Sequence, residues 1–177
     1  MSSGSPALKR TRAVARGHNT APLGATRREE DPMGKPTTDD YTAIRMVAER
    51  YVDAVNRFDP DAWISCWAPD GVWQTMEARE GREKILESWM AAMTRLPNVY
   101  MHVYSGVVDD VTGDQASGRW YMGEYLNMPD GSRSMNSICY VDTYTRIDGQ
   151  WHIQTRRFDA LYRGPADLSG EFSKLDG

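Results

Sequence analysis

Apolar residues recur every three or four positions after Thr37, which is the period of one face of an α-helix. Threonine and aspartate open this segment, and such residues cap a helix N-terminus and interact favourably with its dipole. Pro60 disfavours helical geometry at Asp59 but suits the first turn of a new helix. We therefore expect one helix that ends between Asn56 and Phe58 and a second over residues 60–67. The apolar face of the first helix consists of Tyr41, Ile44, Val47, Ala48, Tyr51, Val52 and Val55.

The hydrophobic period changes from helical to β-like after residue 97. Before that point, a Pro-Asp-Gly turn leads into a short strand over residues 72–76, and a third helix is expected over residues 81–93. After it come four runs rich in β-branched and aromatic residues, separated by glycine-containing turns. Helices followed by an antiparallel meander predict an α+β fold, in which a strongly curved, cone-shaped sheet wraps round the N-terminal helices and encloses a pocket. The four expected strands span residues 99–108, 116–127, 133–146 and 150–158.

Aromatic residues divide the 177-residue chain into unequal parts. The first forty residues contain none, whereas all eighteen Phe, Trp and Tyr follow from Tyr41 onward. Residues 1–36 carry seven Lys or Arg against three acids and few large apolar groups, so we expect a disordered basic extension there, with a targeting peptide or a later start at Met33 as alternatives. A single domain over residues 37–163 and a flexible tail over residues 164–177 complete the expected organisation.

Composition narrows the possible partners. A formal net charge of -4 disfavours a surface that tracks nucleic-acid phosphates, and no apolar run approaches the length of a spanning helix. Cys66 and Cys139 are isolated, and no histidine has a second ligand at metal-binding spacing. We therefore expect a cytoplasmic protein without metal or cofactor that binds a small molecule and neither nucleic acid nor membrane.

Strand alternation sorts the side chains of each expected strand into two faces. Several sets mix aromatic and polar groups, as the walls of a small-molecule pocket do. Alternation does not decide which face points inward, so solvated surface is the competing interpretation. The sets are Tyr100, His102 and Tyr104; Trp120, Met122 and Glu124; Asn136, Ile138, Tyr140 and Asp142; and His152, Gln154 and Arg156.

The order of several short motifs resembles the SnoaL-like branch of the nuclear transport factor 2-like superfamily. These motifs are YVDAVNRFD at residues 51–59, WAPDGVW at residues 67–73, GREKI at residues 81–85, the strand that bears His102, and YTRIDGQWHI at residues 144–153. The resemblance covers residues 38–160 and implies a cone-shaped sheet around a deep pocket, commonly in a homodimer or higher homo-oligomer.

Within that branch the chain looks most like cofactor-free lyases of the scytalone dehydratase and hexachlorocyclohexane dehydrochlorinase type. The resemblance implies an aspartate at Asp59, a histidine at His102 and an arginine at Arg156, or at Arg157 if a bulge shifts the register. Two positions depart from the pattern, because Ala54 replaces a lysine and Phe58 replaces a tyrosine. Both departures argue against the substrates of those two enzymes as the substrate of this chain.

These residues suit proton abstraction. His102 would act as the base, and Asp59 would orient its ring and stabilise the imidazolium. Arg156 would stabilise developing negative charge, with further donors beside it. Glu124 would be a second acid or base, or a partner of Arg156. The residues expected to contact substrate are Trp73, Tyr100, Trp120, Met122, Glu124, Asn136, Ile138 and Tyr140.

Each assignment has a structural alternative. Asp59 before Pro60 is also a typical helix cap, and a lone histidine or an arginine pair often has no catalytic role. The leading hypothesis is a cofactor-free lyase or isomerase acting on a small apolar or aromatic substrate. The alternatives are a polyketide cyclase or epoxide hydrolase of the same fold, a non-catalytic binding or dimerisation module, and an isomerase with Glu124 or Asp142 as a lone buried carboxyl.

Overall fold

The computed structural model describes residue 1, residues 34–167, residue 169 and residues 171–172. The expected basic extension therefore lies almost entirely outside the described residues. Three helices precede most of the sheet: α1 (Thr38–Arg57), α2 (Pro60–Ser65) and α3 (Arg82–Met93). The strands are β1 (Trp67–Gln74), β2 (Ala78–Glu80), β3 (Asn98–Thr112), β4 (Gln115–Asn127), β5 (Arg133–Ile147), β6 (Gln150–Gly164) and β7 (Glu171–Phe172).

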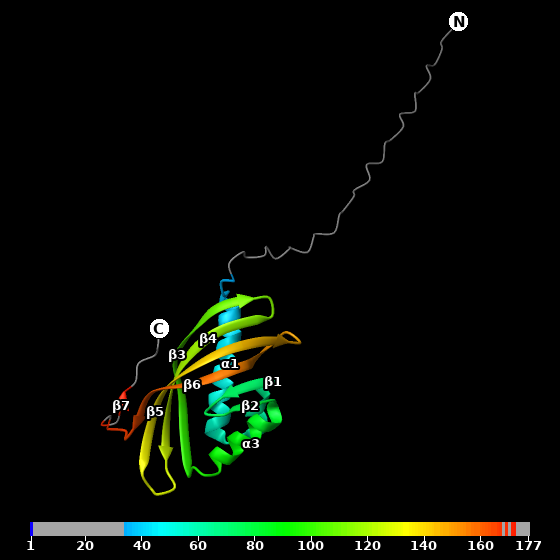
Figure 1. Cartoon of the computed structure of the whole chain (residues 1–177). Coiled ribbons are helices and arrows are strands. Elements are labelled where there is room, and N and C mark those ends of the chain that lie inside the picture. The colour runs from blue at the N-terminus through cyan, green and yellow to red at the C-terminus, as the bar shows by residue number, and fades with distance from the viewer. Residues whose placement is uncertain (2–33, 168, 170, 173–177) are drawn as a thin grey trace. The chain divides into compact units, whose positions relative to one another are not determined.

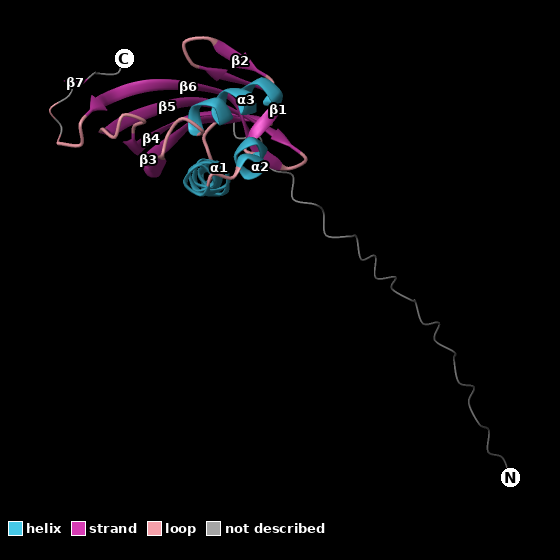
Figure 2. Ribbon diagram, turned by 90° about the horizontal axis from the view of Figure 1, so that it is seen from below, coloured by secondary structure: helices cyan, strands magenta, loops and turns pink. Residues whose placement is uncertain are grey.

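The strands form one curved sheet in the order β2-β1-β6-β5-β4-β3, with β7 paired to β6. The four long strands from β3 to β6 are antiparallel neighbours, whereas β1 runs parallel to β6. Figures 1 and 2 show the helices on one face of this sheet, with α1 lying across the long strands. This confirms the expected α+β fold. The parallel pair and β2 were not expected, and β7 falls inside the segment expected to be a tail.

The ends of α1 follow from local chemistry. The Thr37 side chain accepts a hydrogen bond from the Asp40 N–H at the N-terminus. At the other end Phe58 adopts left-handed geometry with φ 51°, and the Asp59 N–H bonds to the Ala54 carbonyl. Left-handed geometry is uncommon for a bulky residue, and here it turns the chain directly into α2.

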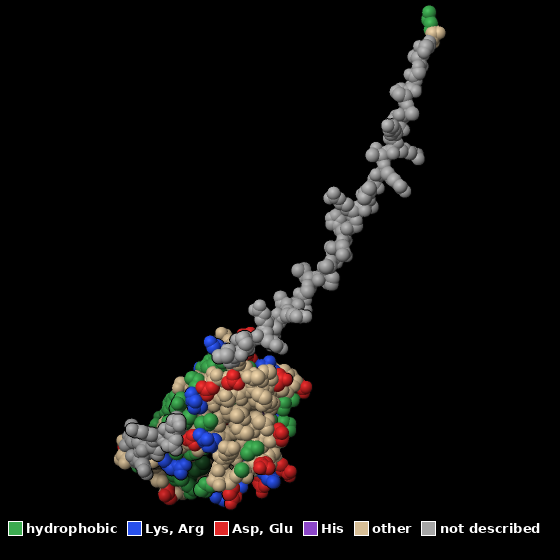
Figure 3. All heavy atoms as spheres, turned by 45° about the horizontal axis from the view of Figure 1, so that its top comes forward, with side chains coloured by type: hydrophobic (Ala, Val, Ile, Leu, Met, Phe, Trp, Pro, Cys, Tyr) green, Lys and Arg blue, Asp and Glu red, His purple; other side chains and the backbone are tan. Residues whose placement is uncertain are grey.

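The core lies between the helices and the sheet. Its densest part is a tryptophan cluster formed by Trp63, Trp67, Trp73 and Trp89, in which Trp63 stacks on Trp89 with ring centroids 4.7 Å apart. Trp63 and Trp67 are fully buried, and the cluster joins α2, β1 and α3. Acidic and basic side chains are interspersed on the face seen in Figure 3. No helix in the described part of the chain is long and apolar enough to cross a membrane.

Candidate functional site

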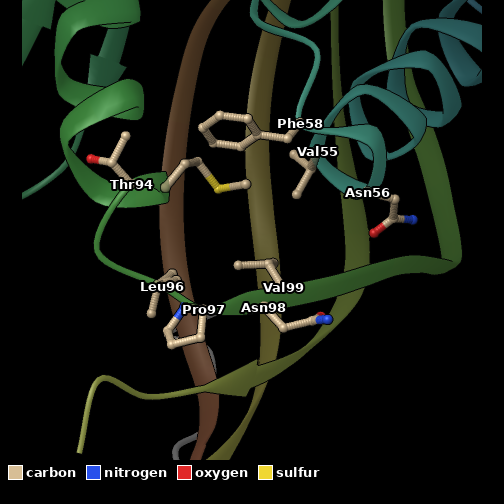
Figure 4. Close-up of a pocket in the computed structure, with 9 residues that line it drawn as sticks. Val55, Asn56, Phe58, Thr94, Leu96, Pro97, Asn98 and Val99 are labelled. Atoms are coloured by element: carbon tan, nitrogen blue, oxygen red, sulfur yellow. The ribbon is translucent and has the colours of Figure 1, made fainter.

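A hollow of about 430 Å³ opens where α1 ends, α3 ends and β3 begins. In Figure 4 the side chains of Phe58, Val55 and Val99 point into it, with strands of the sheet behind. No Lys, Arg, Asp or Glu is among its lining residues, and apolar and polar uncharged side chains both contribute, so it suits an uncharged ligand. The lining consists of Val55, Asn56, Phe58, Met93, Thr94, Leu96, Pro97, Asn98 and Val99.

Phe58 holds one wall of the hollow. Its ring stacks on Trp89 with centroids 5.6 Å apart, so the tryptophan cluster supports it from behind. The residue nevertheless remains 43% exposed, a large exposure for a phenylalanine. A supported aromatic ring with an open face is a ready contact for an apolar ligand.

Asn56 fixes the opposite wall. Its Nδ2 donates to the Met101 carbonyl at 2.8 Å, and the Met101 N–H donates to its Oδ1 at 2.7 Å. The amide thus replaces a neighbouring strand at the free edge of β3. This pair of bonds ties the C-terminus of α1 to the strand that carries Val99.

A polar pair, Glu124 and Asn136, lies near the hollow in a row of residues that are paired across neighbouring strands. Strand register places Met101, Glu124, Asn136 and Arg163 side by side, next to the row that contains Val99. Paired residues share a face, and Met101 is buried in the core, so this row faces the helices. Asn136 Nδ2 donates to Glu124 Oε2 at 2.9 Å.

Burial raises the pKa of the Glu124 carboxyl above its ordinary value, opposed by the hydrogen bond from Asn136 and by the charge of Arg163. Asn136 is only 8% exposed, and its Oδ1 is a buried acceptor that no described residue satisfies. A partly desolvated carboxyl one row from an uncharged hollow is a candidate proton-transfer group.

Arg156 belongs to a separate, fully buried network. Its guanidinium donates to both Asp142 carboxylate oxygens, at 2.9 and 2.7 Å, and lies 4.3 Å from the ring centroids of Tyr51 and Tyr140. Burial lowers the pKa of Arg156, but the Asp142 carboxylate outweighs this and holds it well above its usual value. Tyr144 donates to Asp142 and accepts from Trp120. Arg156 therefore pairs with Asp142, and the alternative in which it pairs with Glu124 is wrong.

The structure does not bring Asp59 and His102 together. Asp59 caps α2 through the Ala62 N–H and bonds to Arg57, and the Ala62 bond foremost lowers the pKa of its carboxyl. His102 contacts three tyrosines, and its Nδ1 has no partner among the described residues. A Cβ added to Gly123 would lie 2.7 Å from His102 Nε2, so His102 and Gly123 share the face opposite to Met101.

The Asp59–His102 pair is therefore not formed, and the physical reason is strand parity. Because Met101 points into the core, its neighbour His102 must point outward. Tyr100 shares that outer face and is 57% exposed, so it does not contact the hollow.

The other residues expected to contact substrate lie in the core or beside it. Trp73 belongs to the tryptophan cluster, while Glu124 and Asn136 share the row described above. None of the expected residues is among those that line the hollow. Trp120, Met122, Ile138 and Tyr140 are at most 3% exposed.

Sequence reasoning missed the residues at the hollow's rim. Asn56 and Phe58 were noted only as the end of a helix or as a departure from a pattern. The relevant signal was that two helix ends meet the start of one strand. Within the described ranges, no three His, Cys, Asp or Glu side chains group as metal ligands would.

Comparison with known proteins agrees with this architecture. The sequence profile of the SnoaL-like domain matches residues 36–157, so the chain belongs to the SnoaL-like family. The fold also resembles those of several solved structures.

Three solved structures illustrate the similarity. A proposed aromatic ring hydroxylase from Novosphingobium aromaticivorans has TM-score 0.68 and 21% identity, over 72% of this chain and 92% of that one. A proposed scytalone dehydratase from the same organism has TM-score 0.67 and 16% identity, over 75% and 91%. A hexachlorocyclohexane dehydrochlorinase has TM-score 0.67 and 17% identity, over 78% and 95%. At these identities the likeness establishes the fold.

Proposed function

We propose that this protein is a cofactor-free lyase or isomerase that transfers a proton on a small apolar substrate, with Glu124 as the acid and base. The observation that carries the proposal is a partly desolvated carboxyl on the helix-facing side of the sheet, one row from a hollow without charged lining residues. Two of the similar structures are named as a proposed dehydratase and a dehydrochlorinase, both eliminating enzymes, which supports this class of reaction.

The chemistry needs only the carboxyl and the substrate. In an isomerisation, ionised Glu124 would accept a proton from carbon beside a carbonyl and return it to another carbon. In an elimination, ionised Glu124 would accept a proton from carbon, and the same carboxyl would donate that proton to the leaving hydroxyl as the carbon–oxygen bond breaks, so that a double bond and water form. A pKa raised above the ordinary value brings such a group closer to the range in which both directions are useful.

The test compares two variants of the full chain on the first substrate found among aromatic hydroxy-ketones, lactones and steroids. Glu124→Gln preserves shape and removes the proton, so kcat should fall by roughly 10²–10⁴-fold. His102→Ala removes the base that the family resemblance implied, and it should leave kcat within about twofold, because His102 faces away from the hollow. A large loss of kcat in His102→Ala with little change in Glu124→Gln would support His102 as the base and contradict the role proposed for Glu124.

A ligand that binds without turnover would instead make this chain a binding module. The homodimer and the cytoplasmic location expected from the sequence stay predictions.

A further inference from the structure

We infer that Glu124 and Asn136 together form a subsite for a hydroxyl oxygen of an uncharged, otherwise apolar ligand. This inference rests on the proposed function, because it concerns the same carboxyl and a ligand that extends from the hollow to the neighbouring row of the sheet, where Glu124 and Asn136 lie. It adds the chemical class of the ligand, which neither the fold nor the family defines.

Among the described residues, the Asn136 amide has a hydrogen-bond partner at its nitrogen but none at its oxygen. Its Nδ2 donates to Glu124 Oε2, which fixes the plane of the amide, while Oδ1 has no partner in the described part of the chain. The side chain is more than nine-tenths buried. A buried acceptor without a donor costs free energy, so a ligand that supplies a donor gains affinity at this point.

Glu124 supplies the complementary group. Asn136 occupies one carboxyl oxygen, and no hydrogen bond to the other is found among the described residues. Glu124 interacts electrostatically with Arg163, Tyr51 and Tyr140, and Arg163 is exposed. Burial favours the protonated carboxyl, which is a donor.

A donor and an acceptor side by side match a hydroxyl group, which accepts and donates at one oxygen. A ketone only accepts, so it would leave Asn136 Oδ1 unsatisfied. A carboxylate or phosphate would meet an uncharged wall, without a cation among its lining residues to balance its charge. The pair therefore selects alcohols over ketones, and both over hydrocarbons of the same shape.

The test uses three probes of one skeleton: tetralol, tetralone and tetralin. Their dissociation constants are measured by titration calorimetry on the full chain. Because a net hydrogen bond contributes on the order of a factor of three to ten, tetralol should bind about tenfold or more tighter than tetralin, with tetralone between them. Val99→Trp, which fills the hollow, should abolish binding of all three.

Two variants separate the subsite from the hollow. Asn136→Ala removes the acceptor and should bring tetralol to within about twofold of tetralone, with circular dichroism confirming the fold. Glu124→Gln keeps a donor beside the acceptor, so it should preserve the preference for tetralol even though turnover is lost. This variant provides the test of the subsite if Asn136→Ala does not fold.

The binding results distinguish failure of the hydroxyl subsite from failure of the proposed function. Equal binding of the three probes to wild type, sensitive to Val99→Trp, would overturn the hydroxyl subsite and leave the hollow as the ligand site. Absence of binding by all three would overturn both the subsite and the apolar hollow on which the proposed function rests. Binding that is unaffected by Val99→Trp would place the ligand elsewhere and likewise overturn both.

Discussion

At the scale of single residues, the molecule separates a carboxyl that is available for chemistry from one that is not. Asp142 is paired with Arg156 at 2.7 Å, and both side chains are completely buried. In the described part of the chain, the hydrogen-bond partner of Glu124 is the neutral amide of Asn136, and Glu124 lies in the row next to that of Val99. The two residues are on the same face of neighbouring strands, so their different partners give them different roles.

The Asp142–Arg156 pair should be structural. Asp142→Leu leaves an unpaired buried guanidinium, so the free energy of unfolding should fall by about 3–5 kcal/mol in urea denaturation. The double variant Asp142→Leu with Arg156→Met should be more stable than Asp142→Leu alone, because no charge is then stranded. A cost below about 1 kcal/mol for Asp142→Leu would contradict this assignment.

At the scale of elements, the site depends on how α1 meets β3. Asn56 makes two hydrogen bonds to Met101, whereas Asn98 lines the same hollow with no hydrogen bond from its side chain among the described residues. Asn56→Ala should lower the free energy of unfolding by about 1–3 kcal/mol and weaken ligand binding, while the matched Asn98→Ala should change stability by less than about 0.5 kcal/mol. Thermal unfolding and calorimetry measure both; equal effects would show that the Asn56 bonds do not hold the wall.

Periodicity predicted the helices and the four long strands, because each buries one regular face, although β3 and β6 continue four and six residues beyond the ends expected for them. A strand was expected over residues 72–76, but periodicity did not predict the first part of β1, whose pairing with β6 is interrupted between Trp67 and Val72. Nor could it choose the inward face of β3. Alternation grouped Tyr100 with His102 correctly, but packing of Met101 against the helices decided that this group points outward.

The candidate site was predicted only in part for the same reason. Glu124 and Asn136 were expected on an inward face and lie there, since Trp120 and Met122 on the same strand face are strongly apolar. The aspartate position was misassigned, because a cap sequence such as Asp59-Pro60 carries no information about a distant imidazole. Contacts between helix ends and strand edges arise from tertiary packing, which a local pattern does not contain.

At the scale of the whole molecule, the hydrophobic core is formed by residues from Tyr41 to Phe158. A protein that begins at Met33 retains Gly34, whose carbonyl accepts a hydrogen bond from the Val111 N–H. We expect this truncation to change the free energy of unfolding by less than about 0.5 kcal/mol and to leave ligand affinity unaltered. A cooperative loss of stability in urea denaturation would show that residues 1–32 belong to the folded domain.

The central claim is that Glu124 is a desolvated acid and base beside a ligand hollow. Its carboxyl can be titrated directly by NMR in protein with carbon-13 at glutamate side chains, assigned with Glu124→Gln. Because burial raises the pKa, Glu124 should stay protonated at pH values where an ordinary glutamate, with a pKa of about 4.3, is already ionised. Its resonance should also shift when tetralol is added. A midpoint at the ordinary value together with no response to ligand would contradict the account.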